Sequence, residues 1–184
     1  KVEYVSPNGS PSLKGIMNFT DVSLSSQNFK NVHVEVLFKD NQLAIRDFKI
    51  QDIDNGIASC EGSVSCNFPP EKDKPLINPN DTIDVQIEFN NFLFSTFNSF
   101  VFPKQQKEGK LSGDIAIQNC LGDPLLIYNN TVKEPVFDKL VGNNLIARGF
   151  YRDSKLMFND LIIDDGNGIY KGYGYLPYDV SIVP

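Results

Sequence analysis

Apolar residues recur at every second position through most of this 184-residue chain. The clearest runs are Val32, Val34, Val36 and Phe38, and then Ile83, Val85, Ile87 and Phe89. Because successive side chains of a β-strand point to opposite faces, this period predicts strands with one buried face. Further strands are expected at 43–50, 57–66, 111–117, 124–128, 144–151, 155–163 and 169–176, so the predicted fold class is all-β.

The apolar parity changes inside one expected strand. Leu43 and Ile45 are followed by Phe48 and Ile50, so the apolar residues move from odd to even positions. One extra residue in a strand sends every later side chain to the other face. We therefore expect a bulge or corner at Arg46-Asp47.

An internal repeat contains this parity change twice. The segment KDNQLAIRDFKIQDIDNGIASCEGSVS, 39–65, aligns with RDSKLMFNDLIIDDGNGIYKGYGYL, 152–176, and both contain Asn-Gly. Repeats of this kind build elongated structures by stacking copies. We interpret 1–184 as a single β-repeat segment of a larger protein, with approximate units at 11–68 and 109–178 joined by 69–108.

One segment departs from the period of two. Residues 90–102 read NNFLFSTFNSFVF, in which Leu93, Phe97 and Phe100 recur at spacings of three and four. This stripe is typical of a short amphipathic helix, and Pro103 is a stop signal just after it. A helix is expected near 91–101, although the aromatic content leaves a strand as the alternative.

Charge and motif content argue against several classes of function. The net charge is −6 and no run of Lys and Arg occurs, whereas a nucleic-acid partner requires a concentrated basic surface. The sequence has no G-x-S-x-G, H-E-x-x-H or Gly-rich phosphate loop. We therefore expect a protein that is not an enzyme, has no cofactor and binds no nucleic acid.

The cysteines and the single histidine do not predict a metal site. No C-x-x-C occurs, and His33 is expected on the exposed face of its strand. Cys60 and Cys66 would lie about 20 Å apart in one continuous strand, too far for a disulfide. With Cys120 they are expected to be buried or half-buried free thiols.

Acidic pairs precede both Asn-Gly dipeptides. Asp52 and Asp54 stand before the first, and Asp164-Asp165 before the second. Such pairs could act as acids or calcium ligands. Asp at this place in a turn usually accepts hydrogen bonds from the backbone, and that role is expected here.

A series of short phrases resembles a known family when read in order. An alternating strand at 83–89 leads into the Phe-rich segment, followed by GKLSGDIAI at 109–117 and LGDPL at 121–125. Residues 156–175 then resemble the phrase "L-x-apolar-x-apolar … D-x-x-G-x-apolar-x-x-x-G". From about 12 to 177 the chain is similar to the C-terminal domain of the TamB and AsmA-like bacterial envelope proteins. Asn119 stands where that family often has glycine.

The resemblance implies a long antiparallel sheet curled into an open, taco-like or solenoid trough with an apolar lining. It also implies a periplasmic segment of an inner-membrane-anchored protein that moves phospholipid between membranes or assists outer-membrane protein assembly. The implied partners are phospholipid acyl chains and an outer-membrane β-barrel assembly protein, with membrane contact made by the parent protein. The expected groove-lining residues are Val32, Val34, Val36, Phe38, Ile83, Val85, Ile87, Leu156 and Phe158.

Two other interpretations remain open. The same alternating residues could form the closed core of a structural or adhesive cell-surface module. A carbohydrate-binding sandwich would require an exposed aromatic platform, for which the candidates are Tyr170, Tyr173, Tyr175 and Tyr178.

Overall fold

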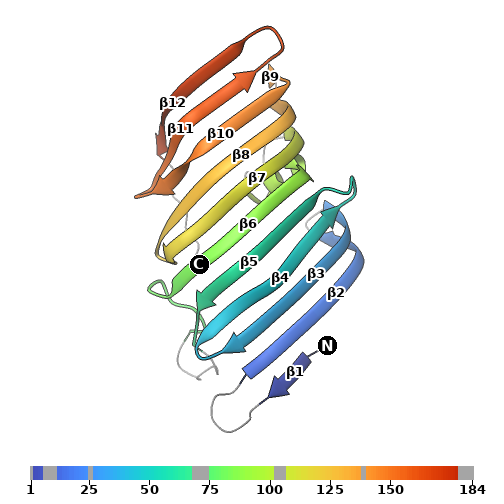
Figure 1. The fold of residues 1–184 in the computed structure, drawn as a ribbon, viewed down its shortest axis with the longest axis vertical. Helices are drawn as coiled ribbons and strands as arrows, with labels where there is room; N and C mark the ends of the chain where they lie inside the picture. The colour runs from blue at the N-terminus through green and yellow to red at the C-terminus, as the bar shows by residue number, and fades with distance from the viewer. Residues whose placement is uncertain are drawn as a thin grey trace.

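The computed structural model describes residues 2–5, 12–24, 27–67, 75–101, 107–137 and 140–177. These residues form one open antiparallel sheet of twelve strands with one short helix (Figure 1). Strands that are neighbours in the sheet follow one another in the sequence, except that β10 lies beside β8 and the short β9 pairs with β8 alone. The expected all-β class with a single open sheet is confirmed.

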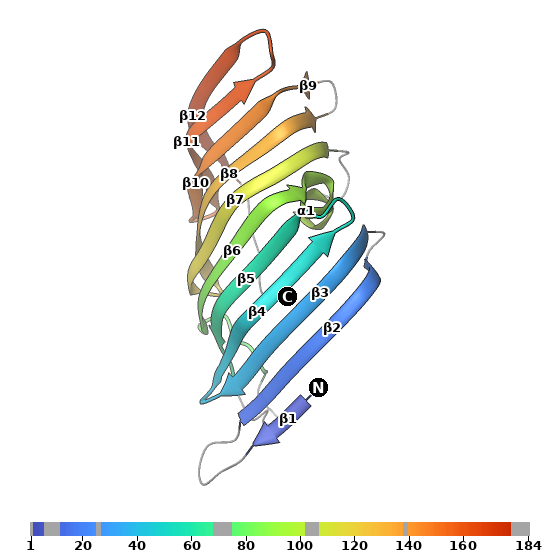
Figure 2. The same ribbon diagram turned by 45° about the vertical axis from the view of Figure 1, so that its right-hand side comes forward.

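The strands have the following bounds in chain order. They are β1 (Val2–Val5), β2 (Ser12–Leu24), β3 (Gln27–Lys39), β4 (Gln42–Asp52), β5 (Ile57–Ser65), β6 (Thr82–Leu93), β7 (Lys107–Cys120), β8 (Asp123–Phe137), β9 (Leu140–Val141), β10 (Asn144–Arg152), β11 (Lys155–Asp164) and β12 (Ile169–Pro177). Figure 2 shows a long twisted ladder that is not strongly curled.

The expected helix is present but shorter than predicted. Helix α1 spans Phe94–Val101, and β6 continues through Leu93 before it begins. Phe92 is held in the sheet opposite Leu111 of β7, so strand pairing competes successfully with the helical pattern at this end. The helix lies against β6 and β7, on one face of the sheet (Figure 2).

The bulge expected at Arg46-Asp47 is confirmed. In the pairing of β4 with β5, Ile45 lies opposite Gly62 and Phe48 opposite Cys60, so two residues of β4 oppose one of β5. The bulge returns the apolar residues of β4 to a single face despite the change of parity in the sequence.

The second repeat copy has the same bulge at residues 159–160. Phe158 of β11 lies opposite Gly174, and Leu161 lies opposite Gly172. A third bulge, which was not expected, occurs in β6 between Phe89 and Phe92. Each of these three bulges faces a glycine with left-handed φ, and these are Gly62 (136°), Gly113 (137°) and Gly174 (155°).

The two Asn-Gly turns occupy equivalent places between β4 and β5 and between β11 and β12. Asp52 Oδ1 accepts hydrogen bonds from the backbone N–H of Asp54 (2.9 Å) and Gly56 (2.8 Å). Asp165 Oδ1 accepts from Asn167 (2.9 Å) and Gly168 (2.8 Å) in the same way. These bonds confirm the expected turn role, while superposition of the whole units stays a prediction.

Five further residues that were singled out from the sequence can now be placed in the structure. Asn119 has φ of 86°, so it meets at this point the backbone requirement that a glycine would meet. His33 is partly exposed and its Nδ1 lies 2.6 Å from Asn18 Oδ1. The three thiols are free, with Cys66 buried and Cys60 and Cys120 half-buried.

Candidate functional site

One face of the sheet is apolar across its whole width. Residues directly opposite each other in an antiparallel pair share a face, so the strand registers define rows that run across the sheet. We call the row through Val36 the Val36 row. It comprises Val2, Gly15, Val36, Ile45, Gly62, Val85, Ile117, Leu126, Tyr151, Leu156 and Leu176, one residue from each of eleven strands.

A second row runs beside it. The Val34 row comprises Met17, Val34, Phe48, Cys60, Ile87, Ile115, Tyr128, Gly149, Phe158 and Gly174. Neither row contains a charged residue. We call the side of the sheet that carries these two rows the apolar face.

All nine residues expected to line a groove lie on the apolar face. Six of them belong to the two rows: Val34, Ile87 and Phe158 to the Val34 row, and Val36, Val85 and Leu156 to the Val36 row. The remaining three lie in flanking rows, where Val32 pairs with Ile50 and where Phe38 and Ile83 are joined through Leu43 and Val64. The registers therefore bring together residues that are more than 100 positions apart in the sequence.

These nine side chains differ in how far they are covered. Ile83 and Val85 are buried, with exposed fractions of 9% and 6%, and they pack against Leu121 in the turn between β7 and β8. The other seven are half-buried. At the Leu121 corner the face is therefore closed by the protein itself, and away from it the cover is incomplete.

Helix α1 covers a second part of the apolar face. Phe94 and Phe97 pack against a buried cluster that includes Phe89 and Phe92. The ring centroids of Phe89 and Phe97 are 5.3 Å apart in an edge-to-face arrangement. This geometry is favourable for aromatic pairs, so α1 is held on the sheet by ring packing as well as by apolar burial.

The margins of the apolar face are open. On β2, Met17 and Phe19 are exposed by 41% and 48%, and on β12 Leu176 is exposed by 56%. Exposed apolar groups in one continuous surface mark interaction sites more often than isolated ones do. The face thus combines a covered centre with uncovered apolar flanks.

Tyr128 and Asn130 are two of the polar side chains on the apolar face. The Tyr128 hydroxyl donates a hydrogen bond of 2.6 Å to the carbonyl oxygen of Met157, and burial raises the pKa of Tyr128 to about 12. Asn130 Oδ1 is buried and has no hydrogen-bond partner among the described residues. Neither side chain adds a charge to the face at neutral pH.

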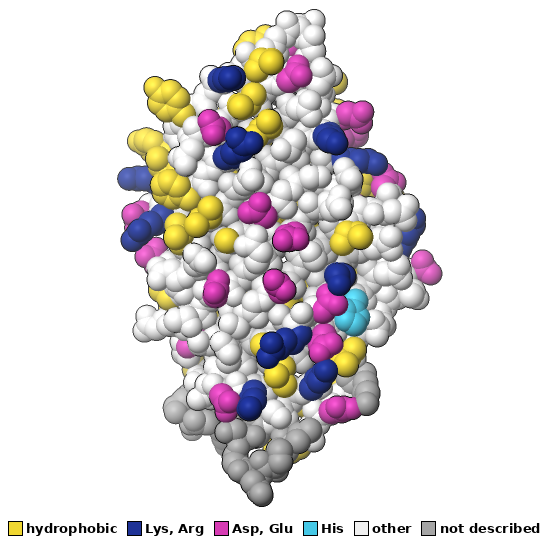
Figure 3. Space-filling view, viewed as in Figure 1, with side chains coloured by type: hydrophobic (Ala, Val, Ile, Leu, Met, Phe, Trp, Pro, Cys, Tyr) yellow, Lys and Arg dark blue, Asp and Glu magenta, His cyan; other side chains and the backbone are white. Residues whose placement is uncertain are grey.

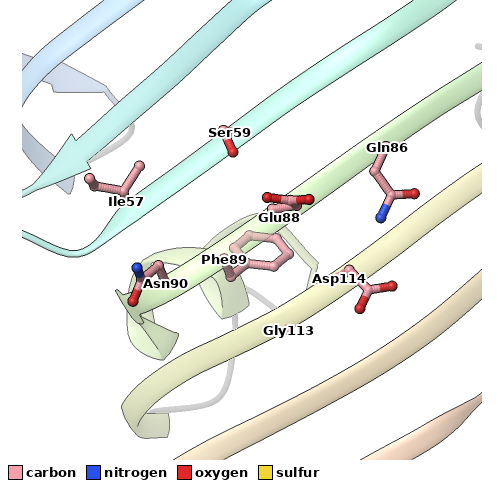
Figure 4. A pocket seen from close by; sticks show the side chains of 8 residues that line it. All are labelled: Ile57, Ser59, Gln86, Glu88, Phe89, Asn90, Gly113 and Asp114. Carbon is pink, nitrogen blue, oxygen red and sulfur yellow. The ribbon is translucent and has the colours of Figure 1, made fainter.

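The opposite face carries the charges. Acidic and basic side chains intermingle over it (Figure 3), and a hollow between β5, β6 and β7 is lined mainly by polar side chains (Figure 4). Glu88 and Asp114 lie opposite each other there. Within the described residues no group of three or more His, Cys, Asp or Glu side chains could hold a metal ion.

The candidate tyrosines for an aromatic platform do not all lie on one face. Tyr170 lies opposite Ile163 on the apolar face, whereas Tyr175 lies opposite Met157 on the charged face. Tyr173 is an odd number of positions from Tyr170, so it points with Tyr175 away from it. Tyr170 therefore does not share a face with Tyr173 and Tyr175, and Tyr178 lies outside the described residues.

Several members of the apolar face were not singled out from the sequence. Phe48, Ile115 and Tyr128 lie in the Val34 row beside the predicted residues. Alternation placed each of them on a strand, but the relative register of distant strands decides which residues share a face. The bulge at Arg46-Asp47 is the signal that could have placed Phe48.

Comparison with known proteins returned no match to a family model, a curated protein or a solved structure. Among the described residues, no helix has the length and apolar character needed to cross a membrane.

Proposed function

We propose that this chain binds phospholipid acyl chains along its apolar face. The observation that supports this most directly is the Val36 row, which crosses eleven strands without a charged residue. Its flanks are exposed, as Met17 and Leu176 show. An antiparallel sheet normally buries one face against a second layer, and among the described residues only α1 and the Leu121 corner supply such cover.

The dimensions and energies of the face suit an extended hydrocarbon ligand. Ten steps of about 4.8 Å between strands give a row of about 48 Å, which exceeds the roughly 30 Å of a bilayer core. Each CH₂ group buried contributes about 0.8 kcal/mol, so a long acyl chain could bind without polar contacts. A weakly curled sheet would present this path as a shallow, open trough.

The wider role follows from the resemblance to TamB and AsmA-like proteins. We propose that the parent protein is anchored in the inner membrane and that this segment lies in the periplasm. There the trough would carry phospholipid between membranes or assist outer-membrane protein assembly with a β-barrel partner. In this role the chain performs no catalysis and requires no cofactor.

Photo-crosslinking in the intact parent protein tests the acyl-chain contact. A photoreactive residue at position 36 or 158 should yield phospholipid adducts by mass spectrometry, because both positions lie on the apolar face. The matched controls are positions 35 and 157, whose side chains point to the charged face. Adducts that are equally frequent at control positions, or absent from 36 and 158 in the folded protein, would contradict the proposal.

Charge substitutions separate transport from folding. Val36→Asp and Phe158→Asp would place a carboxylate on the trough wall, where desolvation by a lipid tail costs several kcal/mol. Lipid transfer should fall severely while the melting temperature changes little, because both side chains are only half-buried. Lys49→Asp, on the charged face, should leave transfer unchanged.

A structural or adhesive module is the second candidate. The burial of Ile83 and Val85 beneath Leu121 favours it, because part of the face is already a closed core. If Val36→Asp and Phe158→Asp unfold the chain and positions 36 and 158 prove inaccessible to solvent, this candidate replaces the lipid trough.

A further inference from the structure

The two covers of the apolar face both lie on strand β6. Phe89 is buried in the cluster beneath α1, and Val85 is buried in the cluster at the Leu121 corner. The exposed fractions of Phe89 and Val85 are 8% and 6%. Alternate residues of a strand share a face, so Ile87 is the one residue of β6 that lies between these two buried positions on the apolar face.

Ile87 belongs to a strip of half-buried side chains that passes between the covers. Among the described residues, Ile87 alone packs against both buried clusters. Its companions in the Val34 row are Phe48, Cys60, Ile115 and Tyr128, and all five side chains are half-buried. We call these five residues, one from each strand from β4 to β8, the central strip.

The apolar face is wider on both sides of the central strip. Three neighbouring rows of the face have half-buried side chains both on β3 and on β11. These are Val32, Val34 and Val36 on β3, and Leu161, Phe158 and Leu156 on β11. On β6 the same three rows contain Phe89, Ile87 and Val85, of which Phe89 and Val85 are buried. Three rows are thus open to a ligand on β3 and β11, whereas one is open on β6.

The dimensions of the central strip match one acyl chain. Four strand spacings of about 4.8 Å make the strip about 19 Å long, and one acyl chain spans about 15 Å, half of the roughly 30 Å of a bilayer core. Val85 and Phe89 are about 13 Å apart along their strand. Carbon atoms in contact are about 4 Å apart, so one chain between two walls requires about 8 Å and two chains side by side about 12 Å. The side chains of the covers occupy part of the 13 Å, so the strip has room for one chain and not for two.

We propose that the central strip is a binding subsite for a single acyl chain and that it narrows the trough between two wider regions. This inference rests on the proposed binding of phospholipid, and it specifies the cargo. A diacyl phospholipid lies with one chain in the strip, while its second chain rests on the wider rows of β3 or β11. The cargo is therefore a lipid whose chains are flexible enough to separate from each other.

A tethered alkyl chain tests single occupancy in the full chain. In a Cys120→Ala variant, hexadecyl methanethiosulfonate joins one alkyl chain to the Cys60 sulfur through a new S–S bond and releases methanesulfinic acid. Peptide mass spectrometry places the adduct on Cys60 and not on the buried Cys66. Photoreactive palmitate should label Ile87 and Ile115 before tethering. After tethering this labelling should be lost, because the strip is then full.

The matched control is Val34→Cys in a Cys60→Ala and Cys120→Ala background. It tethers the same chain in the wide part of the same row. The rows on either side stay open there, so labelling of Val32 and Val36 should persist. Loss of that labelling would show that the trough is one chain wide throughout. Unchanged labelling of the strip with Cys60 tethered would show that the strip has room for a second chain. Either result overturns the single-chain subsite.

The same labels separate this inference from the proposed function. Palmitate that labels Val32 and Val36 but not Ile87 would overturn the single-chain subsite and leave acyl-chain binding in place. Reaction of the alkyl reagent at position 34 but not at Cys60 would have the same meaning. Absence of palmitate label from the whole apolar face of the folded protein would overturn both the subsite and the proposed function.

Discussion

Asp52 joins two parts of the chain that are 41 residues apart. Its side chain is fully buried, and its Oδ2 accepts a hydrogen bond of 2.7 Å from the Leu93 N–H while Oδ1 caps the turn at Gly56. A buried carboxylate is tolerated when backbone donors surround it in this way. Asp52 therefore fixes the point at which β6 gives way to α1.

Replacing Asp52 with alanine should destabilise the protein by roughly 3–5 kcal/mol, because three backbone N–H groups lose their acceptor in a buried place. Asp52→Asn should cost less, since it retains Oδ1 but brings an amide group toward the Leu93 N–H. Urea unfolding measures both changes. Asp54→Ala is the control. An equal loss of stability in Asp54→Ala would show that Asp52 has no special role in joining the turn to the start of α1.

The lowered pKa of Asp165 predicts in which direction the stability of the protein changes with pH. Hydrogen bonds from the backbone N–H of Asn167, then from that of Gly168, lower the pKa of Asp165 below its ordinary value of 3.8. The stabilisation is therefore complete above that value and is lost as the pH falls through the lower folded-state pKa. Asp165→Asn should reduce the urea midpoint at about pH 6, and the gap to the original protein should close toward about pH 2. A gap that is constant over this range would contradict the prediction.

At the scale of single elements, α1 works as a partial cover over the apolar face. Phe97→Ala should destabilise the protein by about 2 kcal/mol, less than the loss of a fully buried ring, since Phe97 is half-buried. It should also increase the binding of an apolar dye, because the surface around Phe89 is uncovered. Ser95→Ala on the same helix is the control. Unchanged dye binding in Phe97→Ala would show that α1 is not a cover.

The extent of each strand was predictable where alternation is clean and not where it fails. The expected strand at 83–89 lies within β6, but the strand expected at 124–128 continues as β8 to Phe137. The continuation could not be predicted because the alternation of apolar residues is interrupted by Asn129, Asn130 and Pro135. Pairing with β7 on one side and β10 on the other holds Asn129 and Asn130 in the sheet, whereas Pro135 lies at a register shift opposite Gly109.

The same limit applies to the candidate site. The parity change predicted the bulge at Arg46-Asp47, and the nine expected residues share one face because no bulged residue interrupts 32–38, 83–87 or 156–158. The Leu121 corner and the role of Asp52 could not be predicted, since both depend on contacts between distant segments. The weak curvature of the sheet could not be predicted either, because it depends on how twist accumulates over all neighbouring strands.

At the scale of the whole molecule, each strand of the path is stabilised mainly by its immediate neighbours. The free energy of local opening should therefore differ from strand to strand along the sheet, as in other proteins built by stacking. Native-state hydrogen exchange should show the highest opening free energies in β4 to β8, where the buried clusters lie, and lower values toward β1 and β12. Uniform protection across the sheet would instead indicate a single cooperative unit.

Because the strands are arranged almost in sequence order, the number of hairpins sets the length of the molecule. Because each strand of the path lies beside the next one in the chain, apart from β9, inserting or deleting one hairpin leaves every other pairing unchanged. Each hairpin gained or lost changes the span by about 10 Å, twice the spacing between strands. The distance that such a protein bridges can thus be set in evolution by counting hairpins, with no redesign of the parts already present.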